Sequence, residues 1–321
     1  MSERPIVVVT GASAGAGRAT VRAFAERGFD VALLARGRAG LEGAAAEVEG
    51  AGGRAICLPT DVAEWAQVRA AARRVEEELG PIEVWVNSAM TTVFAWFDDV
   101  RPEEFRRATE VTYLGQVHGT MAALELMKPR DRGRIVNVGS ALSYVGIPLQ
   151  AAYCGAKFAC RGFFESVHAE LLAQGSNVAI SMVHLPAVNT PQFDWCLSRL
   201  PNKPQPVPPI YPPETAAKFI VRAATDGRRS KIVGSWNKVV VGGAKFAPAV
   251  LSEFVARTAV SGQQTPEPVA PDRAANLFEP VDRDGDHGAA GSFTEQDRGF
   301  WTPSFLESLP NTARTAAEAA V

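Results

Sequence analysis

Two side chains that could move a proton stand four residues apart near the middle of the chain. Tyr153 and Lys157 lie in a stretch with helical character, where residues at this spacing share one helix face. A tyrosine with its ordinary pKa of about 10 is a poor base at neutral pH, but a neighbouring ammonium group favours the phenolate and lowers that pKa. The pair therefore predicts proton transfer, although a core tyrosine beside a surface lysine would show the same spacing.

A serine upstream of this pair supports the catalytic interpretation. Ser140 follows the apolar run 135–139 and precedes Tyr153 by thirteen positions. Ligands of open α/β sheets bind outside the carboxyl ends of the strands, so a hydroxyl at a strand end is expected to face the ligand crevice. We therefore predict that Ser140 hydrogen-bonds a substrate oxygen while Tyr153 exchanges the proton.

A glycine-rich turn near the N-terminus has the chemistry of a phosphate site. It follows the apolar run 6–10 and precedes a helix-like segment that ends near Gly28. Glycines let the backbone approach a ligand closely, and the unpaired N–H groups at a helix start favour a pyrophosphate. An ordinary tight turn is the alternative. The predicted cofactor contacts in this turn are Gly11, Ser13, Ala14, Gly15, Ala16 and Gly17.

The end of the second apolar run bears on the choice of cofactor. In dinucleotide folds an acidic residue about 20 positions after the glycines binds the ribose diol, whereas an arginine accommodates a 2′-phosphate. Ala35 stands where the acid would be, and Arg36 follows it. A guanidinium group can bind phosphate through two hydrogen bonds, so NADP(H) is predicted, with a solvated surface arginine as the alternative.

The elements that must position these residues alternate along the chain. Short runs rich in Val and Ile are separated by helix-length stretches. Within most of these runs apolar and polar residues do not alternate, as expected when both sheet faces are buried. Repeated strand–helix–strand units predict an α/β class with a doubly wound parallel sheet, a Rossmann fold of about seven strands. The expected strands are residues 6–10, 31–35, 55–58, 84–87, 135–139, 178–184 and 231–234.

A proline-rich segment interrupts this alternation. Nine prolines fall between residues 186 and 213, where they disfavour both helix interior and central strand. A long loop in a compact domain is usually functional, so we expect a lid. Its apolar side chains, Phe193 and Trp195 among them, predict a hydrophobic carbonyl or alcohol substrate. Alternatively, these side chains are buried against a partner subunit. Trp96, after the fourth expected strand, is a further candidate for the substrate pocket.

The chain continues beyond the alternating region. The pattern of residues 246–260 predicts an amphipathic helix, and a polar tail with many prolines and glycines follows it. We therefore expect a catalytic domain over residues 1–245 and an extension over residues 246–321. The tail would fold over the active site or a neighbouring subunit, or lack regular structure.

Together these motifs resemble the short-chain dehydrogenase/reductase family in its short-subunit type, with TGxxxGxG and YxxxK motifs. The resemblance covers about residues 5–235. It implies an enzyme that interconverts a secondary alcohol and a ketone or aldehyde with NADP(H), in which Tyr153 is the general acid/base beside Lys157 and Ser140. It also implies a homodimer or homotetramer.

The resemblance implies further cofactor contacts. Asp61 and Val62 would hold the adenine, although Asp61 would also suit an N-cap. Lys157 would hold the nicotinamide ribose, and Thr190 would contact the carboxamide. The full set of additional contacts is Asp61, Val62, Asn87, Ser88, Ala89, Tyr153, Lys157, Pro186, Val188 and Thr190.

Three positions depart from the family pattern. Met90 and Ala187 stand where glycine is usual, and Met90 places a side chain near the expected cofactor. Thr112 replaces an asparagine that helps to organise a water path to the catalytic lysine. Its hydroxyl keeps an altered relay possible, which makes Thr112 a candidate catalytic residue, or it simply packs in its helix. These departures leave a sensor or structural protein that binds NADP(H), or an epimerase or dehydratase, as alternative functions.

Composition argues against several other classes. The chain has 321 residues, a net charge of -2 and 46% hydrophobic residues, which gives no footprint for nucleic acid. No apolar run reaches the roughly 18 residues of a membrane span, and no signal peptide precedes the first strand, so a cytoplasmic protein is expected. The histidines lack metal-ligand spacing, and so do the cysteines, which are Cys57, Cys154, Cys160 and Cys196.

Overall fold

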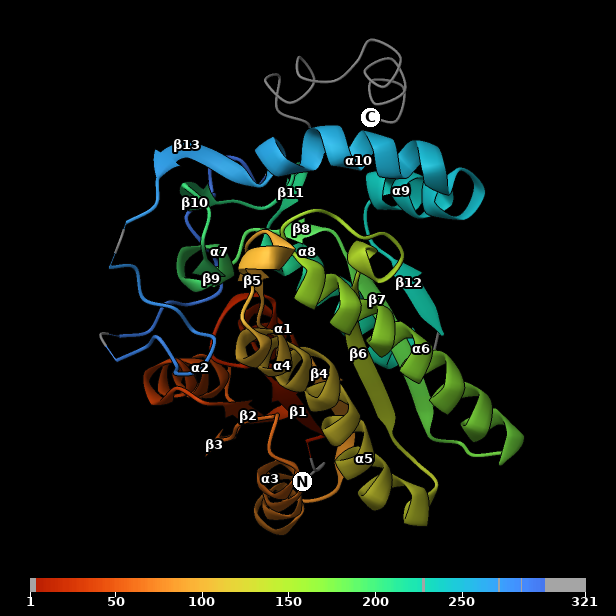
Figure 1. Cartoon of the computed structure of the whole chain (residues 1–321). Helices are drawn as coiled ribbons and strands as arrows, with labels where there is room; N and C mark the ends of the chain where they lie inside the picture. Colours follow the sequence, from red (N-terminus) through yellow and green to blue (C-terminus); the bar gives the residue numbers. More distant parts are fainter. Residues whose placement is uncertain (1–3, 227–228, 271, 284, 298–321) are drawn as a thin grey trace.

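The computed structural model describes residues 4–226, 229–270, 272–283 and 285–297, and its centre is a parallel sheet (Figure 1). The sheet has seven strands in the order β12-β7-β6-β4-β1-β2-β3, which confirms the predicted α/β class with a doubly wound sheet. Its strands are β1 (Ile6–Thr10), β2 (Asp30–Ala35), β3 (Ala55–Pro59), β4 (Ile82–Asn87), β6 (Arg134–Ser140), β7 (Ala179–Leu185) and β12 (Ser230–Ile232).

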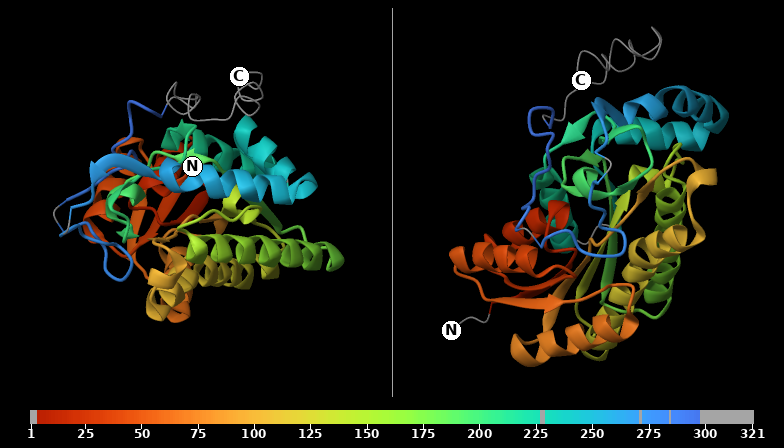
Figure 2. Two further views of the ribbon diagram at one scale, coloured as in Figure 1. Left: turned by 45° about the horizontal axis from the view of Figure 1, so that its top comes forward. Right: turned by 60° about the vertical axis from the view of Figure 1, so that its left-hand side comes forward.

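Helices cover both faces of the sheet. One layer contains α1, α2 and α8, and the other contains α3, α5 and α6, with α4 packed against α6 (Figures 1 and 2). The helices are α1 (Gly15–Ala25), α2 (Arg38–Gly50), α3 (Trp65–Glu78), α4 (Pro102–Thr109), α5 (Gly115–Met127), α6 (Ala151–Ala173) and α8 (Pro213–Asp226).

Residues 6–9 of strand β1 are all apolar because both faces of the strand are buried. Val7 and Val9 pack into the core beneath α1 and α2, whereas Ile6 and Val8 pack into the core beneath α3 and α5. Successive side chains of a strand point to opposite faces, so a strand buried on both faces must be apolar throughout. The same reason applies to the other central strands.

The helical stretch that leads from α4 to α5 contains an irregularity. Helices α4 and α5 are joined by a π-helical turn, Glu110–Leu114, that carries Thr112. Such turns often occur at functional sites. Short 3₁₀ turns occur at Phe97–Asp99, Lys128–Arg130 and Ala141–Ser143.

The proline-rich segment 186–213 contains short paired strands. Strand β9 pairs with β5, β11 pairs with β8, and β10 pairs with β13 from the C-terminal extension. The predicted helix 246–260 appears as α10, and α9 precedes it without having been predicted. These elements are β5 (Val93–Phe94), β8 (Ala187–Val188), α7 (Gln192–Trp195), β9 (Leu197–Ser198), β10 (Asn202–Pro204), β11 (Ile210–Tyr211), α9 (Ser235–Phe246), α10 (Pro248–Gly262) and β13 (Gln264–Pro268).

After β13 the described residues 269–297 form no helix or strand. In Figure 1 this blue segment descends from β13 and passes beside α2. Residues 298–321 of the expected extension lie outside the described residues, and the division at residues 245 and 246 stays a prediction. Among the described helices, none is long and apolar enough to cross a membrane.

A buried polar network joins β4, β6 and α5. Asn87 accepts a hydrogen bond from Trp85 Nε1 at 2.8 Å and donates through Nδ2 to Asn137 Oδ1 at 2.8 Å and Thr120 Oγ1 at 3.1 Å. A Cβ at Gly119 would lie 2.0 Å from Asn87 Oδ1. A side chain at residue 119 must therefore displace this network.

We expect Gly119→Ala to lower the free energy of unfolding by about 1–3 kcal/mol, since overpacking displaces the Asn87 amide. Gly162 in α6 is the matched control, because a Cβ there meets nothing within 4 Å. Gly162→Ala should stabilise the protein by about 0.5–1 kcal/mol. Urea denaturation measures both changes, and equal effects of the two substitutions would contradict the assignment.

Candidate active site

Ser140, Tyr153 and Lys157 lie together at the carboxyl edge of the sheet. Ser140 ends β6, and the other two residues lie in the first two turns of α6. The Ser140 hydroxyl accepts a hydrogen bond from Leu142 N at 3.1 Å and is hydrogen-bonded to the Tyr153 side chain. All three residues line one cavity. The structure thus brings together the residues that the sequence predicted as catalytic.

Lys157 is buried, with 2% of its surface exposed. Its Nζ donates to the Val138 carbonyl at 2.8 Å and lies 5.6 Å from the centre of the Tyr153 ring. Gln116 Nε2 also donates to the Val138 carbonyl, at 2.8 Å. Burial lowers the pKa of Lys157, because an apolar environment disfavours the charged form.

The pKa of Tyr153 differs from the sequence-based expectation. Burial raises this pKa above its usual range, and the hydrogen bond with Ser140 opposes the rise. The predicted lowering by Lys157 is therefore wrong for this structure, since desolvation of the phenolate outweighs every favourable contact. The phenol consequently holds its proton at neutral pH, which suits a proton donor.

His184, at the end of β7, holds the backbone of Ser140. It is 1% exposed, and its Nδ1 lies 3.2 Å from the Ser140 carbonyl. A carbonyl can only accept, so Nδ1 carries the proton, and Nε2 then accepts from the Tyr144 hydroxyl at 3.2 Å. Burial lowers the pKa of His184 to about 4. The ring is therefore neutral and links Tyr144 to the end of β6.

The glycine-rich turn between β1 and α1 forms the floor of a cleft of about 210 Å³. Gly11 has a φ of 69°, and a Cβ there would lie 2.8 Å from Ala89 Cα. A Cβ at Gly17 would lie 2.0 Å from the Gly11 carbonyl oxygen. Side chains at these positions would close the turn against its neighbours, so the cradle fits the pyrophosphate of a dinucleotide.

Most of the predicted cofactor residues line this cleft. Thr10, which the sequence analysis did not select, holds the loop opposite the turn, because its Oγ1 accepts from Ser88 N at 3.0 Å and Ala89 N at 3.2 Å. The predicted residues that line the cleft are Gly11, Ser13, Ala14, Gly15, Ala16, Gly17, Arg36, Val62, Ser88, Ala89 and Thr190.

A second cavity of about 280 Å³ continues from this cleft and contains Ser140, Tyr153 and Lys157. Two predicted cofactor residues, Pro186 and Val188, line this second cavity rather than the cleft. Both cavities are lined by Ala16, Ser88, Met90, Thr190 and Gln192. Met90, the departure from glycine, thus stands at the junction. A ligand can therefore extend from the glycine turn to the catalytic side chains.

Helices α9 and α10 cover the second cavity with apolar side chains. The pattern of residues 246–260 indicated an apolar helix face, but nothing local indicated what this face covers. Gln263, at the end of α10, donates to the Pro148 carbonyl at 3.1 Å and accepts from Gln150 Nε2 at 2.6 Å. Gln150 precedes α6, so the roof is tied to the catalytic helix. The roof residues include Trp236, Val240, Leu251, Phe254 and Val255.

Two predicted cofactor contacts need correction. The Asn87 side chain points into the buried network described above, so its amide does not face the cleft. Asp61 forms an ion pair with Arg107 and accepts from Ala63 N at 3.0 Å in a turn before α3. Its predicted role as an N-cap is wrong, because α3 begins at Trp65 and Glu64 is its N-cap. Both side chains have partners within the protein, and neither lines the cleft.

Thr112 does not carry the predicted water relay. Its Oγ1 donates to the Thr91 carbonyl at 2.7 Å and accepts from Thr91 N at 3.0 Å. This hydroxyl has one proton, and the Thr91 carbonyl takes it. Thr112 therefore fixes the loop after β4, which is the packing alternative.

The predicted substrate residues are divided by the structure. Phe193 lines the second cavity, as expected for a lid residue. Trp195 lines the cofactor cleft instead, and its ring lies 4.9 Å from that of His287. Trp96 is 52% exposed and lines neither cavity, so its assignment to the substrate pocket is wrong.

No cluster of three or more His, Cys, Asp or Glu side chains in the described part of the chain could hold a metal ion. The polar groups that meet at this site are the hydroxyl of Ser140, the phenol of Tyr153 and the ammonium group of Lys157. Their common position at the junction of an apolar cavity and a phosphate cradle suits proton transfer next to a bound dinucleotide.

Comparisons with known proteins agree with this geometry. A family model described as short chain dehydrogenase matches residues 5–195. The chain is 30% identical over 276 residues to "Uncharacterized oxidoreductase YxnA" of Bacillus subtilis, covering 85% of this chain and 78% of that protein. It is 32% identical over 241 residues to 3-dehydrosphinganine reductase of Danio rerio, covering 71% and 70%.

A solved structure has a similar fold. An alcohol dehydrogenase from the archaeon Thermococcus sibiricus, complexed with 5-hydroxy-NADP, superposes with a TM-score of 0.62 and 26% identity. The superposition covers 72% of this chain and 95% of that chain.

The neutral His184 predicts a specific loss of stability in acid. Its pKa falls from 6.5 to about 4 on folding because the ring is desolvated, so below pH 6.5 the unfolded chain binds a proton that the folded protein does not. Stability that is present above pH 6.5 is therefore lost as the pH falls, by about 2 kcal/mol between pH 7 and pH 5. His184→Asn, which keeps a donor for Ser140, should lose this component. Urea denaturation at the two pH values measures it, and an identical pH dependence in both proteins would exclude His184 as the cause.

Proposed function

The chain belongs to the short-chain dehydrogenase family of oxidoreductases, and on that premise we propose an NADP(H)-dependent enzyme that interconverts a secondary alcohol and a ketone or aldehyde. One observation carries the proposal. Ser140, Tyr153 and Lys157 line an apolar cavity that opens into the cleft above the glycine turn. A carbonyl carbon in this cavity would lie between a proton donor and a site for a dinucleotide.

The chain's own residues handle the proton. In the direction of reduction, Ser140 donates a hydrogen bond to the carbonyl oxygen and Tyr153 Oη delivers its proton to that oxygen. The ammonium group of Lys157 stabilises the phenolate that remains. In the reverse direction Tyr153 Oη accepts the alcohol proton. The nicotinamide, when bound, supplies or accepts the hydride.

NADP(H) is proposed as the cofactor because of the residues around the cleft. The glycine turn would hold the pyrophosphate, and Arg36 would hold the 2′-phosphate. Strand β2 ends in Ala35 and not in an acidic residue, which would bind the ribose diol instead. Lys157 and Thr190 would contact the nicotinamide ribose and carboxamide. The structural neighbour complexed with 5-hydroxy-NADP supports this choice.

A hydrophobic ketone or alcohol is the proposed substrate class. The walls of the second cavity come from β5, the lid, α9 and α10, and they carry aromatic and aliphatic side chains such as Phe94, Phe193 and Phe254. The similarity to a 3-dehydrosphinganine reductase supports a lipophilic carbonyl compound.

A homo-oligomer and a cytoplasmic location are also proposed. Met121 on α5 and Phe158 on α6 are exposed apolar side chains, at 49% and 45%, and a contact between subunits would bury them. All four cysteines belong to the described residues and are free thiols, which suits a reducing compartment.

Removal of the Tyr153 hydroxyl tests the proton-donor assignment. Tyr153→Phe should lower kcat for a hydrophobic ketone by about 10²–10⁴-fold and leave the Kd of NADPH nearly unchanged, since general acid catalysis is lost. Turnover is followed through the absorbance of NADPH, with short-chain and long-chain ketones. Tyr113→Phe is the control, because Tyr113 packs on Phe163 away from both cavities. Retention of turnover by Tyr153→Phe would refute the assignment.

Removal of the Arg36 guanidinium tests the cofactor assignment. Arg36→Leu should reduce the ratio of kcat/KM for NADPH to kcat/KM for NADH by about 10–100-fold, the effect of a charged hydrogen bond to phosphate. Arg38→Leu is the control, because the Arg38 side chain is largely exposed and pairs with Glu42. The assignment fails if both variants keep the wild-type ratio.

A further inference from the structure

An acidic segment near the C-terminus lies across the cleft that would hold the cofactor. We name residues 276–283 and 285–288 the acidic strap. Its first three carbonyl oxygens, those of Asn276, Leu277 and Phe278, accept hydrogen bonds from the Arg36 guanidinium at 2.5, 3.4 and 2.6 Å. The group proposed to bind the 2′-phosphate is thus already bound to oxygen atoms of the chain itself.

A second arginine contributes to the same cluster. Arg107 Nε donates to the Leu277 carbonyl at 3.2 Å, so both guanidinium groups meet at one oxygen. The two cations disfavour one another, and burial together with Arg107 lowers the pKa of Arg36. Asp61, which pairs with Arg107, offsets part of this repulsion, and carbonyl dipoles offset more of it. The strap supplies the dipoles.

Asp282 occupies the space beside Arg36. Its Oδ2 accepts from Gly40 N at 3.2 Å, and a Cβ at Gly37 would lie 2.0 Å from that oxygen. Gly37 follows Arg36 and is the N-cap of α2, and Gly40 lies in the first turn of that helix. A carboxylate therefore lies where the resemblance places a 2′-phosphate, and Asp282 lines the cofactor cleft.

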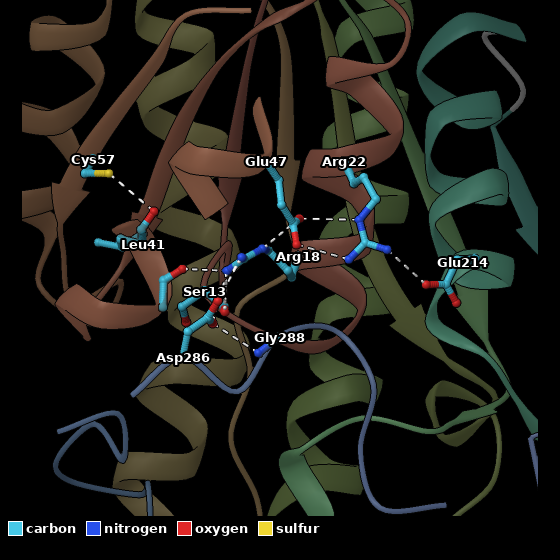
Figure 3. Close-up of polar contacts among 10 residues, drawn as sticks. Ser13, Arg18, Arg22, Leu41, Glu47, Cys57, Glu214, Asp286 and Gly288 are labelled. Atoms are coloured by element: carbon cyan, nitrogen blue, oxygen red, sulfur yellow. Dashed lines mark hydrogen bonds and ion pairs between the residues drawn. The ribbon is translucent and has the colours of Figure 1, made fainter. Parts of the chain in front are cut away.

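The end of the strap reaches the glycine turn. The Gly288 carbonyl accepts from Gly15 N at 3.2 Å, which takes one of the N–H groups proposed for the pyrophosphate. Asp286 pairs with Arg18 at 2.9 Å, and Arg18, which is 2% exposed, also pairs with Glu47 at 2.9 Å. Figure 3 shows Asp286 and Gly288 beside this Arg18–Glu47 pair. The strap is thereby fixed to α1.

The chemistry of these contacts indicates that the strap competes with the cofactor phosphates and does not hold a bound cofactor in place. At Arg36, Gly40 and Gly15 the strap presents oxygen acceptors, which is what phosphate groups would present to the same donors. The described residues of the strap include three acids, Glu279, Asp282 and Asp286, and one arginine, so the charge of the strap repels an anionic cofactor. A clamp on a dinucleotide would present donors and positive charge instead.

We propose that the acidic strap is an internal ligand of the cofactor-phosphate site, so that NADP(H) binds by displacing it. The inference rests on the proposed function, because it takes the same cleft as the cofactor site. The apparent affinity for NADP(H) is then the intrinsic affinity reduced by the fraction of molecules in which the strap is released. Weakening the strap must therefore tighten cofactor binding.

The test is a double substitution in the full chain, Asp282→Ala with Asp286→Ala. Neither side chain belongs to the catalytic set, and their loss removes both carboxylate contacts of the strap. The Kd of NADPH, measured by calorimetry, should fall by about tenfold relative to wild type. The charge-matched control is Glu267→Ala with Asp272→Ala, which removes two exposed carboxylates before the strap and should leave the Kd unchanged.

Hydrogen exchange of the wild-type protein gives a second readout that needs no variant. Addition of NADPH should increase amide exchange in the acidic strap and decrease it in residues 11–17. Reduced exchange in both segments, or a Kd that is unchanged or weaker in the double variant, would overturn the inference and leave the proposed function intact. Failure of the wild-type protein to bind either NADPH or NADH would overturn both.

Discussion

One buried hydrogen bond, from Lys157 Nζ to the Val138 carbonyl, fixes the geometry of the whole site. An ammonium group in an apolar interior is costly unless it is hydrogen-bonded, so the first turns of α6 cannot move away from β6 without leaving that charge unpaired. Val138 lies two residues before Ser140 in the same strand. The bond that holds the lysine therefore also sets the distance from Ser140 to Tyr153, and Gln116 brings α5 to the same carbonyl.

Because the sheet is parallel, this arrangement can be predicted from the sequence. All seven strands run in one direction, so residues at their carboxyl ends gather at one edge whatever their separation along the chain. The glycine turn follows β1, Ser88 follows β4 and Ser140 ends β6. The order and spacing of the strands were thus enough to predict that these residues lie together at one edge, and their catalytic and phosphate-binding roles stay predictions.

The predictions that failed depend on packing that local patterns do not contain. Trp96 is an aromatic residue near the site in sequence, but the 3₁₀ turn that follows it leaves the ring exposed. Asn87 gave a usable signal that was missed, because it shares a strand face with Trp85 and so points to the helix layer. The contact between Asp282 and Gly40 joins residues 242 positions apart, and no periodicity indicates it.

The electrostatics of the cavity give burial a direct role in the proposed chemistry. Burial raises the pKa of Tyr153, lowers that of Lys157 and keeps His184 neutral, so the site holds little charge beyond one ammonium group. A phenolate is unfavourable there until its proton has a new partner. In the proposed reaction the proton would therefore leave Tyr153 as the substrate oxygen gains charge, and the lysine and serine would then stabilise a phenolate that forms only during the reaction. Preorganised dipoles around a neutral phenol thus favour the transition state over the resting site.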